Sequence, residues 1–84
     1  MSVDEIRQAV IEAVATVVSL EPSDIKEDAR FVEDLGLDSL ARLEILVELE
    51  RSLNLKFPGS GVPEGVRTVK DTVELVTDLC AGVS

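Results

Sequence analysis

The stretch from Asp34 to Leu40, with the sequence DLGLDSL, holds the best candidate for chemistry in this 84-residue chain. The hydroxyl of Ser39 could act as a nucleophile, or it could be the point at which another group is attached. A serine nucleophile needs an activating base, but the chain has no histidine and no Gly-x-Ser-x-Gly elbow. Asp38 is adjacent, and neighbouring side chains on a helix do not face each other. These residues argue against catalysis by Ser39.

Two other interpretations of Ser39 stand. Gly36 allows a sharp turn with positive φ, and Asp38 is a good N-cap, so Ser39 falls in the first turn of a helix. Serine is common at helix starts for purely structural reasons. A phosphodiester on this hydroxyl would also lie beside the free N–H groups and the positive dipole end of the helix. The position therefore suits either a structural serine or an attachment point.

Metal chemistry and disulfide chemistry find little support. The acidic residues between positions 20 and 37 do not have the spacing of an EF-hand loop. The single cysteine, Cys80, cannot form an internal disulfide, and no Cys/His cluster suggests zinc. We expect Cys80 to be a small core residue near the end of the last helix. No metal site and no catalytic residue is predicted.

The net charge of -9 limits the choice of partner. Such a charge repels phosphate backbones, which argues against nucleic acid, and it favours basic patches on proteins. Acidity that serves solubility alone is the simpler alternative. No apolar run approaches the roughly 20 residues that span a membrane, and the N-terminal segment is not a signal peptide. We therefore expect a cytoplasmic, monomeric protein without a membrane partner.

The elements that position Ser39 can be read from their caps. Ser2 and Glu5 have capping-box spacing, and the first helix should end near Ser19. The second helix is expected from about Ser39 to Leu53, with Asn54 as its stop. Residues 20–37 form a long connection, with a short helical turn at 23–25.

The last helix begins with a second capping-box spacing, formed by Thr68 and Asp71. A weak helical turn is expected at 63–66, after a flexible segment rich in proline and glycine. Residues 1–84 are then one all-α domain, a small four-helix bundle with a long first loop and a short third helix.

Apolar stripes show which faces should be buried. Phe31 is predicted to plug the core from the long connection. The stripe of the first helix comprises Val3, Ile6, Val10, Val14 and Val17. That of the second comprises Leu40, Leu43, Leu46, Val47 and Leu49, and that of the last comprises Val69, Val73, Val76 and Cys80.

The DLGLDSL motif resembles the modification motif of acyl carrier proteins, and the order of helices and loops follows that family over essentially the whole chain. The resemblance implies that Ser39 carries a 4'-phosphopantetheine arm, taken from coenzyme A, and that Asp38 helps to position the transferase and its magnesium ion. The arm ends in a thiol, so cargo would be held as a thioester. The protein itself would be a non-catalytic carrier.

The resemblance also implies a recognition surface and a cavity. Glu44 and Glu50 correspond to acidic positions on the family's partner-recognition helix, and Glu48 adds an acid nearby. Leu40, at the start of that helix, is also expected to take part in partner recognition. Leu40, Leu43 and Val47 would face the core and a cavity for the acyl chain, which Phe31 also lines. The implied partners are a phosphopantetheinyl transferase and ketosynthase, acyltransferase or acyl-ligase type enzymes with basic docking patches.

Two departures from the family pattern bear on the pathway. Ala41 and Arg42 follow the motif where many fatty-acid carriers have an acid, and Arg51 takes another position that is often acidic. We therefore expect Arg42 and Arg51 to take part in partner recognition on a mixed rather than uniformly acidic helix face. An alanine after Asp-Ser-Leu resembles discrete carriers of polyketide or other specialised-metabolite pathways.

Three alternatives rank below that pathway. They are a primary fatty-acid carrier, a peptidyl or aminoacyl carrier, and a non-enzymatic helical interaction module in which Ser39 is only structural. Leu37 stands where a peptidyl carrier usually has glycine, which counts against the second alternative.

Overall fold

The computed structural model describes residues 2–57 and 65–80. Within these ranges the chain forms three α-helices, α1 (Val3–Val18), α2 (Ser39–Leu53) and α3 (Val69–Cys80), and one 3-10 turn, η1 (Pro22–Asp24). The described residues include no strand, only an isolated bridge between Arg30 and Thr68. The all-helical class is confirmed. The expected turn at 63–66 lies mostly outside the described residues, so the four-helix detail stays a prediction.

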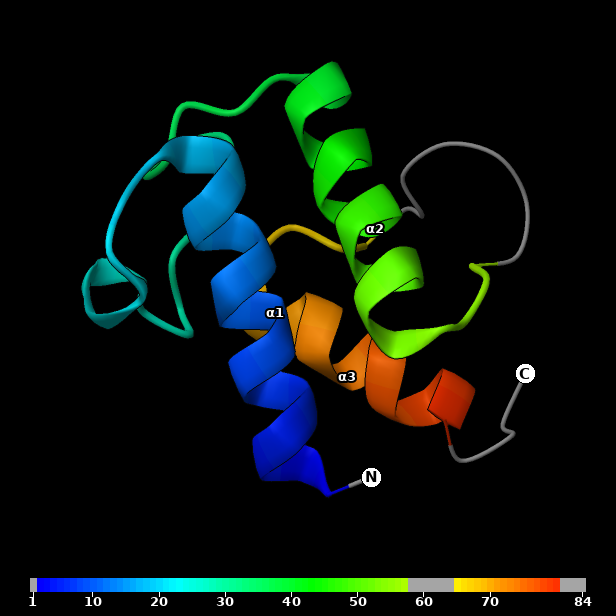
Figure 1. Ribbon diagram of the computed structural model, residues 1–84. Helices are drawn as coiled ribbons and strands as arrows, with labels where there is room; N and C mark the ends of the chain where they lie inside the picture. The colour runs from blue at the N-terminus through cyan, green and yellow to red at the C-terminus, as the bar shows by residue number, and fades with distance from the viewer. Residues whose placement is uncertain (1, 58–64, 81–84) are drawn as a thin grey trace.

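Helix α1 is the element on which the other two pack. It contacts both α2 and α3, whereas no Cα atom of α2 lies within 8 Å of one in α3. Helices α1 and α2 lie side by side and run in opposite directions, so the start of α2 is at the same end of the molecule as the end of α1 (Figure 1). The backbones of α2 and α3 are thus farther from each other than either is from α1.

The predicted caps are confirmed. Ser2 and Glu5 form a capping box at the start of α1, which ends at Ser19 with φ 60°. Asn54 ends α2 with φ 53°. At the start of α3, the Asp71 N–H donates to Thr68 Oγ1 at 3.1 Å and the Thr68 N–H donates to Asp71 Oδ2 at 3.1 Å. These local hydrogen bonds satisfy backbone groups that a bare helix end leaves unpaired.

The core lies where α1 meets α2 and α3. Its fully buried apolar side chains are valine, isoleucine and leucine, and each contributes about 1.5–3 kcal/mol relative to exposure. Phe31, which is 3% exposed, enters from the long connection as predicted. The most buried members are Ile6, Val10, Val14, Ile45, Leu49, Val69 and Val76.

Three predicted core placements on α2 are wrong. Leu40, Leu43 and Val47 are 65%, 37% and 46% exposed. The buried stripe of α2 is instead Ile45, Leu46 and Leu49, and Ile45 and Leu49 belong to the same core cluster as Val10 and Val14 of α1. Two further members of the predicted stripes are exposed, Val3 at 48% and Cys80.

The long connection is ordered by backbone pairing with the start of α3. The Phe31 N–H donates to the Arg67 carbonyl at 2.9 Å, and the Val69 N–H donates to the Ala29 carbonyl at 3.2 Å. An ion pair between Arg7 of α1 and Glu27 ties the same segment to the first helix. These contacts fix the loop that leads into α2.

Candidate functional site

Ser39 is the first residue of α2, and its side chain is exposed. Asp38 precedes it with extended backbone, at φ -89° and ψ -177°, and acts as the N-cap. The Ala41 N–H donates to Asp38 Oδ1 at 2.8 Å. The carboxylate of Asp38 is therefore engaged by the backbone, while the neighbouring hydroxyl is free to meet solvent.

A compact turn presents this serine. The Leu35 N–H donates to the Arg30 carbonyl at 3.1 Å, and the Leu37 N–H donates to the Phe31 carbonyl at 2.8 Å. Gly36 has φ 65°, the left-handed backbone that its type was predicted to supply. Since Phe31 is buried, the turn is anchored to the core immediately before α2 begins.

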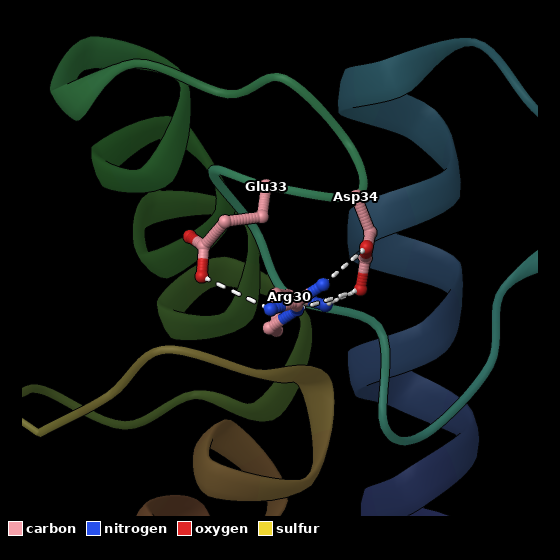
Figure 2. Close-up of polar contacts among 3 residues, drawn as sticks. All are labelled: Arg30, Glu33 and Asp34. Carbon is pink, nitrogen blue, oxygen red and sulfur yellow. Dashed lines mark hydrogen bonds and ion pairs between the residues drawn. The ribbon is translucent and has the colours of Figure 1, made fainter.

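An ion-pair cluster closes the same turn (Figure 2). Asp34 accepts hydrogen bonds from the backbone N–H of Arg30 at 2.8 Å and from its Nε at 3.2 Å. A further pair joins Arg30 Nη2 to Asp34 Oδ1 at 3.2 Å, and Glu33 lies 3.6 Å from Arg30 Nη1. Hydrogen bonds from the Arg30 side chain and backbone hold the pKa of Asp34 below its usual value. Sequence reasoning missed Arg30, although a basic residue four positions before Asp34 was a usable signal.

The exposed leucines and valine of α2 form part of a surface groove. Leu40, Leu43 and Val47 line an open depression of about 460 Å³, together with Thr16 and Val17 of α1. The carboxylates of Glu44 and Glu48 also border it. The residues expected around a buried acyl cavity thus lie on a surface groove, apart from Phe31, which is in the core.

The predicted recognition residues are in different environments. Glu50 accepts a hydrogen bond from the Phe57 N–H at 2.9 Å and so ties down the segment after α2. Glu48 forms an ion pair of 3.4 Å with Arg51. Glu44 borders the groove, next to the exposed apolar side chains that line it.

Arg42 is nine positions before Arg51 and so lies on the opposite side of α2, and its expected part in partner recognition stays a prediction. It precedes Ile45, Leu46 and Leu49 by three, four and seven residues, which places it on the buried stripe of α2. Its side chain is partly exposed, but its Nε is excluded from solvent and has no hydrogen-bond acceptor among the described residues. Arg42 is a cation at the edge of the core, one turn after Ser39.

Metal sites and membrane-spanning segments are two other classes of feature to consider in the described residues. No group of three or more histidine, cysteine, aspartate or glutamate side chains there is arranged to hold a metal ion. None of the described helices is long and apolar enough to cross a membrane.

Comparison with known proteins gives a consistent result. A family model described as "Phosphopantetheine attachment site" matches residues 8–76. The "Acyl carrier protein" of Prochlorococcus marinus is 37% identical over 76 residues, which cover 90% of this chain and 94% of that protein. The "Acyl carrier protein" of a Sulfurovum species is 32% identical, over 90% of this chain and 95% of that one. The "Meromycolate extension acyl carrier protein" of Mycobacterium tuberculosis is 37% identical, over 90% of this chain and 65% of that protein.

Proposed function

The chain belongs to the acyl carrier protein family, and from that premise we propose that Ser39 is the residue to which the 4'-phosphopantetheine arm is attached. A protein of this family is a carrier rather than an enzyme, and the arm is its cofactor. One observation carries the assignment to Ser39. Its exposed hydroxyl stands at the first residue of α2, on a turn held in place by Phe31 and Asp34.

The residues around Ser39 fit a phosphodiester. The start of a 15-residue helix offers backbone N–H groups and the positive end of its dipole. The negative charge of Asp38 would repel the phosphodiester. The Asp38 carboxylate accepts a hydrogen bond from the Ala41 N–H. Arg42 supplies a cation one turn away, with a guanidinium N–H that has no acceptor among the described residues. When bound, the arm supplies the thiol on which acyl groups are held as thioesters.

The benefit of such a tether is a raised local concentration. A cargo held on a flexible arm meets each partner enzyme as an intramolecular reactant, which can raise avidity without new contacts. In this account the chain's own residues hold the arm and present a surface, and Asp38 positions the transferase at Ser39.

The docking surface that we propose is the groove lined by Leu40, Leu43 and Val47, together with Glu44 and Glu48 at its border. Exposed apolar side chains surrounded by carboxylates suit partners that present an apolar anchor within a basic patch. The proposed partners are the phosphopantetheinyl transferase and ketosynthase, acyltransferase or acyl-ligase type enzymes. Arg51 and Glu50 flank this surface, Arg51 through its pair with Glu48.

For the pathway we favour polyketide or other specialised-metabolite biosynthesis, because Ala41 and Arg42 follow the serine motif. Fatty-acid synthesis is the second candidate. It is supported by a 37% identical relative named for meromycolate extension, although that name describes the relative alone. Loading of the holo protein by purified malonyl transferases and ketosynthases of each pathway would separate the two.

The attachment itself is tested by incubation with coenzyme A and a broad-specificity phosphopantetheinyl transferase. Intact mass should increase by one phosphopantetheinyl group in the wild type and not at all in Ser39→Ala. No increase in a folded wild-type protein would favour a helical interaction module instead. An increase that survives Ser39→Ala would move the site to another residue.

A further inference from the structure

Arg42 occupies a position where the fold would otherwise place an apolar side chain. It begins the stripe that continues with Ile45 and Leu49, which are 1% and 0% exposed. The side chain is partly exposed, but its Nε is excluded from solvent. A buried donor without an acceptor costs about 1–3 kcal/mol. The Nε has no acceptor among the described residues, which makes Arg42 a candidate for binding a group that carries one.

Helix geometry relates Arg42 to Ser39. The two residues are three positions apart, so they lie about 4.5 Å apart along the axis and roughly 60° apart around it. Side chains in an α-helix lean toward its N-terminus, which directs the guanidinium of Arg42 back toward Ser39. A group attached to the serine hydroxyl would come within reach of this side chain.

The acidic residues near Ser39 do not form an ion pair with Arg42. The carboxylate of Asp34 is held by Arg30, and that of Asp38 accepts the Ala41 N–H. Arg51, the other arginine of α2, is paired with Glu48. Arg42 forms no ion pair within the described residues.

We propose that the guanidinium of Arg42 binds the phosphodiester of the arm on Ser39 and so positions the arm against the side of α2 that faces the core. The inference rests on the proposed attachment at Ser39. Arginine presents a planar fork of N–H donors that matches two phosphate oxygens, and such charge-assisted hydrogen bonds are short and strong. Attachment of the arm brings phosphate oxygens, which are acceptors, within reach of the partly exposed guanidinium.

This contact separates two surfaces of α2. Arg42 lies on the buried stripe, whereas Leu40, Leu43 and Val47 line the surface groove beside the end of α1. An arm held at its phosphodiester by Arg42 starts away from that groove, so the groove stays open to a partner enzyme. Arg42 is thus a positioning residue for the arm rather than part of the docking surface.

The test compares apo and holo protein labelled with 15N-arginine, after intact mass has confirmed loading from coenzyme A. We expect the Arg42 Nε–H signal to shift on loading and its hydrogen exchange to slow about tenfold, the factor given by one hydrogen bond of ordinary net strength. The 31P signal of the arm should shift in holo Arg42→Gln relative to holo wild type. Holo Arg51→Gln, which removes the same charge on the same helix, should keep the wild-type 31P signal.

The outcomes are distinct. A loaded protein whose Arg42 Nε–H signal equals that of the apo form would overturn the contact, and Arg42 would then be a side chain that only covers the core edge. An unchanged 31P signal in Arg42→Gln would do the same. A wild-type protein that gains no mass would overturn the attachment and the contact together.

Discussion

Asp34 accepts hydrogen bonds from the backbone N–H of Arg30 at 2.8 Å and from its Nε at 3.2 Å, and this pair closes the turn that presents Ser39. Because the pair lies on the surface, it adds little to the free energy of unfolding. Its main effect is to fix the geometry of the turn. The turn also carries the Leu35 and Leu37 N–H bonds to the carbonyls of Arg30 and Phe31. Arg30 thereby influences the site without belonging to it.

The first prediction concerns this pair. Arg30→Gln should speed amide hydrogen exchange at Leu35 and Leu37 and slow modification by the transferase, because the turn before α2 loses its side-chain closure. Exchange followed by NMR and the initial rate of loading would measure both. Glu33→Gln is the matched control, since Glu33 contacts Arg30 only at 3.6 Å. Equal exchange rates in Arg30→Gln and the wild type would show that the backbone bonds suffice.

A second prediction concerns acid pH. The Arg67 N–H and the Thr68 hydrogen bonds hold the pKa of Asp71 below its usual value. A depressed folded-state pKa gives stability that is present above the unfolded value of about 3.9 and is lost as pH falls through the folded value. Thermal unfolding of Asp71→Asn should therefore depend less on pH below about 4 than that of the wild type. Parallel curves for the two proteins would contradict this.

The third prediction uses two leucines of one helix. Leu49 is 0% exposed and Leu40 is 65% exposed. Leu49→Ala should lower the free energy of unfolding by about 2–5 kcal/mol, as buried truncations do, whereas Leu40→Ala should change it by less than about 0.5 kcal/mol. Leu40→Ala should instead weaken binding to a ketosynthase, because Leu40 lines the groove. Urea unfolding and a binding titration would test both halves. Similar stability losses would show that Leu40 belongs to the core.

Gly36 gives a fourth prediction. Its φ of 65° favours glycine, while a Cβ added there would meet nothing within 4 Å. Gly36→Ala should therefore cost about 1 kcal/mol from backbone conformation alone. Gly36→Asn, which tolerates left-handed backbone, should cost less. Urea unfolding of both variants would measure this. An alanine variant as stable as the wild type would show that the turn can adopt another conformation.

Local signals predicted the parts of the fold that local physics determines. The caps at Ser2, Asp38 and Thr68 and the left-handed positions at Gly36 and Asn54 were found because each depends on a few adjacent residues. The defined conformation of residues 20–37 could not be predicted. It depends on backbone hydrogen bonds of Ala29 and Phe31 with residues 67–69, which are far along the chain.

The face of α2 was predicted wrongly for a physical reason. Leucine and valine occur on both sides of this helix, so periodicity alone does not show which stripe is buried. Leu40, Leu43 and Val47 were assigned inward. Ile45 was overlooked, although Leu46 and Leu49, one and four positions after it, complete the buried stripe. Because Arg42 interrupts that stripe, the sequence pattern favoured the outer one.

The central claim is that Ser39 carries the phosphopantetheine arm, and site mapping by fragmentation mass spectrometry tests it most directly. The protein would be loaded from coenzyme A by the transferase and digested, and each serine-containing peptide would be fragmented. We expect the arm only on the peptide that contains Ser39, with full loading retained in Ser19→Ala and Ser23→Ala. A loaded peptide that lacks Ser39, or a folded wild-type protein that accepts no arm, would contradict it.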